Sequence, residues 1–200
     1  MGATDLDLLR RYAADGCEDA FAQLVDRHLG LVHGVAARIV RDRMIAEEVA
    51  QSVFVELARR AESLGRDTIL PAWLHEVARR KAIDSHRREQ RRLRRENLAM
   101  EQLPARSEST WHDLASILDE GLGALGGRDR TALVLRYLRG DSLREVASAL
   151  RISEDAAQKR VSRALERLRG ALSRRGAPVG ASTLASALSA NAAAPAPAGL

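Results

Sequence analysis

Apolar residues recur at steps of three and four positions through most of the chain, and this spacing restricts the fold more than any other feature. One stripe lies within residues 21–39, and a second consists of Ala46, Val49, Val53 and Leu57. Such a period places apolar side chains on one face of an α-helix, where they can pack into a core. Aromatic residues make up only 3% of the chain, which suits helical cores better than a β-sandwich. The sequence predicts an all-α protein.

The stripes divide the chain into two small helical domains joined by a flexible linker. We expect the first domain to span residues 1–95 and the second to span 117–175. The linker, residues 96–116, is polar and contains Pro104. From residue 176 to residue 200 the composition collapses to Ala, Ser, Pro and Gly. This tail has little to bury, so the sequence predicts that it is disordered.

A strongly basic segment follows a predicted loop at residues 61–69. Its helix is expected to begin near Pro71, because the first helical position needs no amide hydrogen. Between residues 79 and 95, nine Arg and Lys residues stand against two acidic residues, although the net charge of the whole chain is only +5. Such crowding of one sign indicates a polyanion partner, with a solvated helix face as the alternative.

The segment 141–168 carries the most specific local signal. Ser142 and Glu145 have the spacing of a capping box, and Ser153 can cap a second helix after a three-residue turn. Arg151 or its neighbour must take the positive-φ conformation that Gly often supplies in such turns. The residues left for solvent or DNA on the second helix are Gln158, Lys159, Arg160 and Arg163. Gln can read adenine and Arg or Lys can read guanine, so a DNA-binding helix-turn-helix is favoured over an ordinary helical hairpin.

Several classes of protein are disfavoured by what the sequence lacks. Cys17 is the only cysteine, which argues against a disulfide framework or a cysteine-based zinc site. We find no Gly-rich phosphate loop, cluster of metal ligands or catalytic triad spacing, so we expect neither an enzyme nor a cofactor. Asp5 and Asp7 stand where a signal peptide would need a basic and then an apolar block. The sequence also has no run of about 18 apolar residues that could form a spanning helix. We therefore expect a cytoplasmic protein without a membrane span.

Taken together, residues 5–172 resemble the extracytoplasmic-function sigma factors of bacterial RNA polymerase. The stretch DRMIAEEVAQSVFVELARR, residues 42–60, resembles the region 2 helix that docks on the polymerase clamp. The stretch AWLHEVARRKAIDSHRREQRR, residues 72–92, is similar to the segment that melts and reads the −10 element. Residues 124–169 resemble region 4, which reads the −35 element. The resemblance implies a subunit that binds core RNA polymerase and directs promoter-specific initiation of transcription.

The resemblance also implies roles for individual residues. Those expected to contact core polymerase are Asp42, Glu47, Glu48, Gln51 and Phe54. Those expected at the −10 element are Trp73, Arg79, Lys81, Arg87 and Arg88. The loop at 61–69 lies where relatives capture a flipped-out base, and Gln158, Lys159, Arg160 and Arg163 would read the −35 element. Sigma factors of this type are commonly held by anti-sigma proteins, so such a partner is also implied.

A conventional repressor or activator that uses only the helix-turn-helix is the main alternative. It would leave the acidic residues near Glu47 and the basic segment at residues 79–95 without a role.

A physical estimate of distances is compatible with the sigma interpretation. Two promoter elements separated by about 17 base pairs lie about 58 Å apart along the duplex, and a linker of about 20 residues can extend to about 65 Å.

Overall fold

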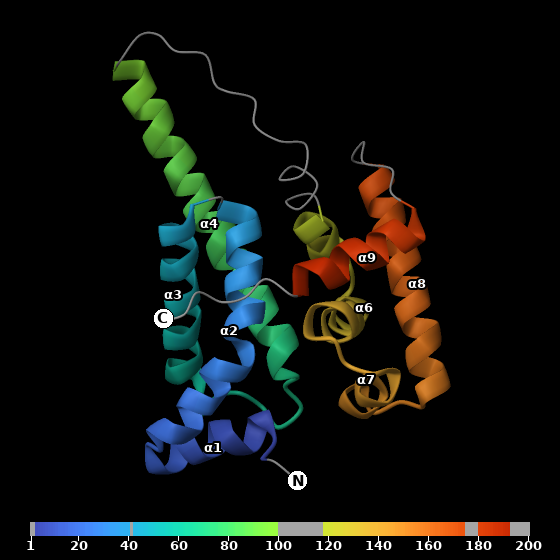
Figure 1. The fold of residues 1–200 in the computed structure, drawn as a ribbon. Coiled ribbons are helices and arrows are strands. Elements are labelled where there is room, and N and C mark those ends of the chain that lie inside the picture. The colour runs from blue at the N-terminus through green and yellow to red at the C-terminus, as the bar shows by residue number, and fades with distance from the viewer. Residues whose placement is uncertain (1–2, 41, 100–117, 175–179, 193–200) are drawn as a thin grey trace.

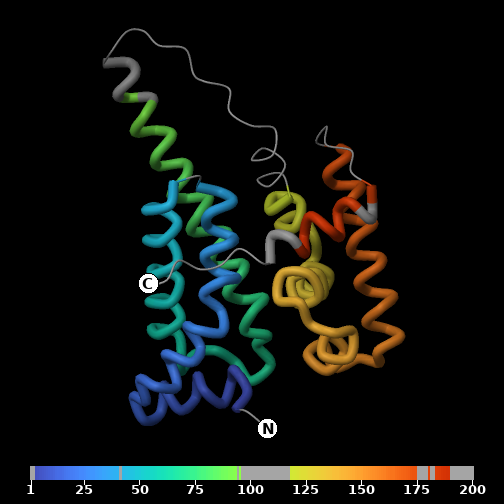
Figure 2. The backbone as a smooth tube through the Cα atoms, viewed as in Figure 1, coloured from blue at the N-terminus to red at the C-terminus, as the bar shows by residue number. Residues whose placement is uncertain are grey.

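The computed structural model describes residues 3–40, 42–99, 118–174 and 180–192, and every regular element within these ranges is a helix. The predicted all-α fold is therefore confirmed. The helices form two bundles that lie side by side, the first built from the N-terminal half of the chain and the second from the C-terminal half (Figure 1). The backbone trace shows the same division without the ribbons (Figure 2).

The first bundle has α2 at its centre. Its helices are α1 (Asp5–Asp15), α2 (Glu18–Val40), α3 (Arg43–Arg60) and α4 (Leu70–Ala99). α2 packs against each of the other three, and α3 also packs against α4. Both predicted stripes point into the interior: Leu24, Val32 and Val35 are fully buried, as are Val53 and Leu57. We call this cluster of buried side chains the first core.

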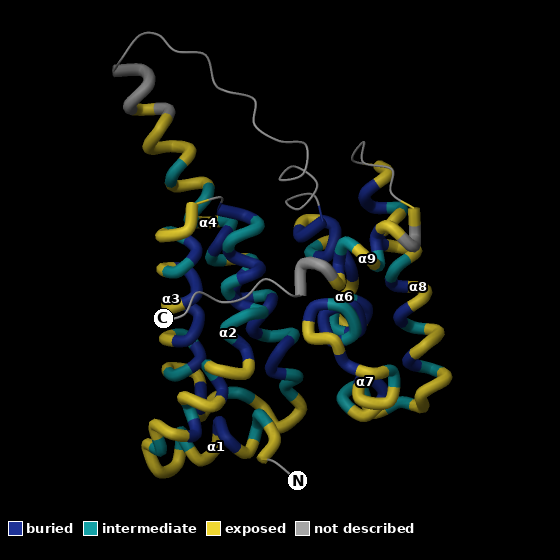
Figure 3. The backbone as a smooth tube through the Cα atoms, in the orientation of Figure 1, coloured by how far each residue is buried: buried dark blue, intermediate teal, exposed yellow. Residues whose placement is uncertain are grey.

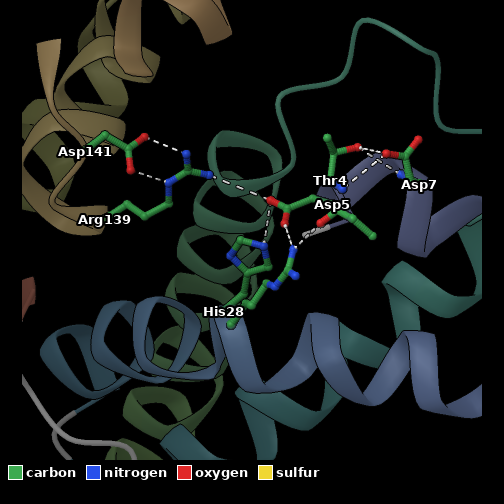
Figure 4. Close-up of polar contacts among 8 residues, drawn as sticks. Thr4, Asp5, Asp7, His28, Arg139 and Asp141 are labelled. Atoms are coloured by element: carbon green, nitrogen blue, oxygen red, sulfur yellow. Dashed lines mark hydrogen bonds and ion pairs between the residues drawn. The ribbon is translucent and has the colours of Figure 1, made fainter. Parts of the chain in front are cut away.

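Side-chain caps mark where α1 and α3 begin, and a left-handed glycine follows the end of α1. Thr4 and Asp7 form a capping box, in which the Thr4 hydroxyl accepts from the Asp7 amide at 3.2 Å and the Asp7 carboxylate accepts from the Thr4 amide at 3.1 Å (Figure 4). α1 ends at Gly16, whose φ of 63° is the left-handed conformation that favours glycine. The Asp42 carboxylate then accepts from the Ile45 amide and caps α3.

The second bundle is built around a second core. Its elements are a helical segment at residues 118–124, α6 (Gly127–Leu133), the π-helix η1 (Val134–Arg139), α7 (Leu143–Leu150), α8 (Glu154–Ser173) and α9 (Ala181–Ala192). Leu122, Leu133 and Leu168 are fully buried members of this second core. A Cβ on Gly121 would lie 2.7 Å from a Leu168 methyl carbon, so the segment 118–124 packs this closely on α8 because residue 121 is glycine.

The expected disorder of residues 176–200 is wrong for part of the tail. Residues 181–192 form α9, whose Leu184 and Leu188 are buried in the second core. Alanine is the strongest helix former, and two leucines four residues apart supply one apolar face. The segments 175–179 and 193–200 lie outside the described residues. So does most of the predicted linker, because α4 continues to Ala99 and the next described residue is 118.

The two bundles contact one another as well as packing internally. Leu31 of α2 and Ile69, just before α4, pack against the second core. Between the bundles, the Arg38 guanidinium donates to both carboxylate oxygens of Asp119, at 3.0 and 3.3 Å. The side chains of this ion pair are 9% and 1% exposed. A charge this deeply buried is tolerated because its partner lies beside it.

His75 of α4 lies next to this ion pair. It is fully buried, with its Nε2 atom 3.8 Å from the Asp119 carboxylate. Within the described residues, neither ring nitrogen has a hydrogen-bond partner. Burial lowers the pKa of His75 to about 4, although the neighbouring Asp119 carboxylate opposes the shift. The imidazole is therefore neutral at pH 7.

The buried histidine makes stability depend on pH. In the unfolded chain His75 regains its ordinary pKa of 6.5, so between pH 6.5 and pH 4 the unfolded state binds more protons than the folded state. Lowering the pH from 7 to 5 is expected to reduce the free energy of unfolding by about 2 kcal/mol through His75 alone. Urea unfolding at both pH values measures the change. In His75→Gln the pH dependence should be smaller by that amount, and an unchanged dependence would contradict the assignment.

Candidate nucleic-acid interface

α3 presents an exposed face with both polar and apolar side chains. Of the residues expected to contact polymerase, Asp42, Glu48 and Gln51 are exposed, and Glu47 is half-buried and paired with Arg43 at 2.9 Å. Phe54 is only 7% exposed and belongs to the first core, so the structure does not place it on this surface.

Two apolar residues that the sequence reasoning missed complete the α3 face. Met44 is 76% exposed and Val55 is 50% exposed. Together with Glu48 and Gln51 they are spaced at three- and four-residue steps, so these four side chains share one side of the helix. We call Met44, Glu48, Gln51 and Val55 the α3 face. The helical spacing from Glu48 would have found Met44 and Val55.

Glu56 of α3 forms ion pairs with two cations of α4 and with one of its own helix. It pairs with Lys81 at 3.0 Å, with Arg80 at 3.1 Å and with Arg60 at 3.3 Å. Burial would raise the pKa of Glu56, but the hydrogen bond and charge of Lys81 and the other cations hold it below its usual value. Lys81 is therefore tied to the first bundle on the side of α4 that faces α3.

Other predicted residues of α4 lie in different surroundings. Trp73 is half-buried and packs against the first core, and Arg79 pairs with Glu76 at 3.1 Å. Arg87 and Arg88 are exposed, and neither forms an ion pair with any residue that the structure describes. The end of α4 that projects beyond the bundle is largely exposed (Figure 3). The structure thus separates two uncompensated arginines from cations that are already paired.

The helix-turn-helix has the geometry that the sequence predicts. Ser142 and Glu145 form the capping box of α7, and the Ser153 hydroxyl caps α8 by accepting from the Ala156 amide. Arg151 adopts φ 55° and ψ 47°, the left-handed conformation, and Ile152 donates to the Ala147 carbonyl as in a Schellman motif. The turn therefore forms with arginine at the position that often holds glycine.

Three of the four predicted base-reading residues lie on the outer side of α8. Gln158, Lys159 and Arg163 are exposed. Lys159 makes only an exposed ion pair with Asp155 at 2.8 Å, and such pairs are weak and readily exchanged. This part of α8 offers one amide and two cations to a ligand, which is the chemistry that reads base edges and phosphates.

Arg160, the fourth predicted residue, points instead toward α6. Its guanidinium donates to Asp129 at 3.2 Å, and Arg167, two turns further along α8, donates to the other carboxylate oxygen of Asp129. Asp129 is 7% exposed and lies in the first turn of α6. One carboxylate thus fixes α8 against α6 at two points. The seven-residue step between two arginines that flank the buried Ala164 is the signal that could have predicted this contact.

Other kinds of site find no support in the described residues. Within them, no group of three or more His, Cys, Asp and Glu side chains could hold a metal ion. In the same part of the chain, none of the helices has both the length and the hydropathy needed to cross a bilayer.

Comparison with known proteins identifies the family. Residues 24–92 match the family model of sigma-70 region 2, and residues 121–170 match that of sigma-70 region 4. The ECF RNA polymerase sigma factor SigK of Mycobacterium sp. (strain KMS) is 32% identical over 154 residues, which cover 74% of this chain and 80% of that protein. The chain belongs to the ECF RNA polymerase sigma factors. It binds core RNA polymerase and directs promoter-specific transcription.

A second relative supports the same family. RNA polymerase sigma factor CarQ of Myxococcus xanthus is 32% identical over 158 residues, covering 78% of this chain and 90% of that protein. A solved structure of CnrH in complex with the cytosolic domain of CnrY is 26% identical, covers 85% of this chain and 97% of that chain, and has a TM-score of 0.43. Membership in the sigma family removes the conventional repressor or activator as the preferred interpretation.

The contact between α6 and α8 should contribute measurably to stability. Asp129→Asn leaves two arginines facing a neutral amide, and we expect the free energy of unfolding to fall by about 2 kcal/mol. Asp155→Asn is the matched control on α8, because its ion pair with Lys159 is exposed and should be worth less than about 1 kcal/mol. Urea unfolding of both variants measures the difference. Equal losses would show that Asp129 does not anchor α8.

Proposed function

We propose that the sigma function of this chain is divided among three surfaces on three helices. Residues 1–95 would form the unit that binds core polymerase and the −10 element, and residues 117–175 the unit that reads the −35 element. The observation that carries this proposal is the distribution of exposed side chains over three places: the α3 face, the exposed arginines of α4 and the outer side of α8. Each surface has a different chemical character, so each suits a different ligand.

The α3 face suits a protein partner. Met44 and Val55 offer apolar area to bury, and Glu48 and Gln51 between them offer polar groups that can fix the orientation of a partner. An acidic, partly apolar helix face does not suit the phosphate backbone of DNA. We therefore assign this face, with the neighbouring Asp42 and Glu47, to core polymerase.

The exposed arginines of α4 suit DNA. Arg87 and Arg88 can bind phosphates without first breaking an ion pair, and each such contact releases condensed counterions. Trp73, Arg79 and Lys81 lie earlier on the same helix, nearer to the loop at 61–69. We assign these five residues to engagement and opening of the −10 element.

The outer side of α8 suits the major groove. Gln158, Lys159 and Arg163 would read the −35 element, while Arg160 would act by holding α8 against α6 through Asp129. No residue of the chain performs covalent chemistry in this scheme, because the polymerase supplies it. The protein would act in the cytoplasm, with an anti-sigma protein as a further partner implied by the sequence resemblance.

Run-off transcription with core RNA polymerase tests the assignment of α4. Arg87→Glu with Arg88→Glu replaces attraction to phosphates by repulsion, and we expect promoter-dependent transcript to fall at least tenfold while core binding is retained. Arg10→Glu with Arg11→Glu is the matched control, since it makes the same charge change on two exposed arginines of α1. If the α4 variant loses core binding equally, the two surfaces are not separate.

Binding to core polymerase without DNA tests the α3 face. Met44→Glu with Val55→Glu places two charges where apolar contact is proposed, and the affinity for core is expected to fall about tenfold or more. Leu93→Glu is the control, because Leu93 is an exposed apolar residue of α4 outside this face. Competition against labelled wild-type protein measures the affinities. A similar loss in the control variant would mean that the α3 face has no special role.

A further inference from the structure

Buried and complementary charges build the contact between the two bundles. Asp119 and Arg38 form a nearly inaccessible ion pair, in which the acid comes from the second bundle and the base from the first. Beside it, Glu76 of α4 pairs with Arg130 of α6, which also donates to the Leu125 carbonyl at 3.1 Å. The charge order is reversed between these two pairs, so the interface has a definite register.

Two further ion pairs lie at the edge of this contact. Asp5 of α1 is 3.7 Å from Arg139 of η1, and Arg139 is itself held by Asp141 at 2.6 Å (Figure 4). Burial of Asp5 opposes its ionisation, but hydrogen bonds from His28 and Arg27 keep its pKa below the usual value. Asp5 is therefore ionised at neutral pH and attracts Arg139.

A glycine lets the second bundle approach Arg79. A Cβ on Gly123 would lie 2.8 Å from Nη1 and 2.9 Å from Cζ of Arg79, so any larger residue would displace the guanidinium. Arg79 and Arg87 also line a pocket together with Asp119 and Ala124 of the second bundle. The second bundle thus covers part of the α4 surface assigned above to the −10 element.

The same contact brings together two parts that must act far apart on a promoter. Asp67, in the loop at 61–69, pairs at 2.7 Å with Arg151, in the turn of the helix-turn-helix. The −10 and −35 elements lie about 58 Å apart along duplex DNA. A molecule in which these two parts touch cannot hold both elements at once.

α9 adds a connection that lies outside both family matches. The matches end at residues 92 and 170, whereas α9 spans residues 181–192. Leu184 and Leu188 attach α9 to the second core, and the helix packs against η1 and α8 of the second bundle and also against α2 of the first. It therefore reaches from one bundle to the other.

We propose that the free protein is held in a closed, autoinhibited arrangement by these interbundle contacts, with α9 as a strap, and that it opens to read a promoter. The closed arrangement itself follows from the contacts, whereas its inhibitory effect rests on the proposed assignment of Arg79 and of the loop at 61–69. Opening separates the Arg38–Asp119 pair, uncovers Arg79 and frees the loop from Arg151.

Energy transfer between two fluorophores tests the closed arrangement in the full chain, without polymerase or DNA. Glu62 and Glu154 are exposed and lie in different bundles, near in the sequence to Asp67 and Arg151 respectively. With Cys17→Ser removing the native thiol, Glu62→Cys and Glu154→Cys carry the labels. High transfer is expected for this protein, and low transfer would overturn the closed arrangement.

Two substitutions at the interface are expected to open the molecule. Gly123→Gln places a side chain against Arg79 and favours the helix in which it lies, while Glu76→Arg faces Arg79 and Arg130 with a like charge. Each should at least halve the transfer efficiency, and adding Arg130→Glu to Glu76→Arg should restore part of it. Gly30→Gln is the matched control, a helical glycine whose Cβ would meet nothing within 4 Å. Wild-type transfer in both folded variants would overturn the proposal.

The strap and the inhibitory effect have separate readouts. Leu184→Asp with Leu188→Asp should lower transfer as well, and unchanged transfer would overturn the role of α9. In run-off transcription at limiting protein, Gly123→Gln should give at least twofold more transcript than Gly30→Gln. Lower energy transfer without more transcript would overturn autoinhibition, while lost transcription in the α4 arginine variants would still support the assignment of the promoter surface.

Discussion

The ion pair between Arg38 and Asp119 is the interaction on which the relation between the two halves of the molecule depends. Each bundle has its own core and its own helix caps. The buried ion pair, in contrast, has one partner in each bundle. Removing one partner of a buried pair typically costs about 3–5 kcal/mol, because the other charge is left without compensation. Moving the bundles apart, as proposed above, would return both groups to water instead.

Acidic residues decide which cations remain available to a ligand. Glu56 occupies Arg80 and Lys81, and Asp129 occupies Arg160 and Arg167. Exposed cations remain elsewhere on the same helices, such as Arg88 on α4 and Arg163 on α8. A basic stripe in a sequence is thus a mixture of structural and functional residues, and only the fold separates the two groups.

The parts of this structure that were predictable from the sequence depend on neighbours close in the chain. The inward stripes, the capping box of Ser142 and Glu145 and the left-handed Arg151 all follow from residues within a few positions of one another. Family resemblance supplied the three candidate surfaces. These local rules hold because helix geometry repeats every 3.6 residues.

The features that the sequence did not predict share one cause, which is contact between distant segments. Phe54 is buried because α3 packs in the first bundle, and Arg160 is engaged because α6 supplies Asp129 thirty-one positions away. α9 is ordered because the second core accepts Leu184 and Leu188. The alanine-rich composition of the tail does not reveal that α9 packs on the second core, because only two leucines make that contact.

The anchoring of α8 also has a consequence for how promoter preference can change over evolution. The helix is held in place by Val161, Ala164 and Leu168 on its inner side and by the arginines that bind Asp129. Gln158 and Arg163 take no part in this anchoring. Substitutions at exposed positions such as these usually change the free energy of unfolding by less than about 0.5 kcal/mol. Under the proposed assignment of Gln158 and Arg163 to the −35 element, the recognised sequence can therefore drift in a lineage while the second bundle stays folded.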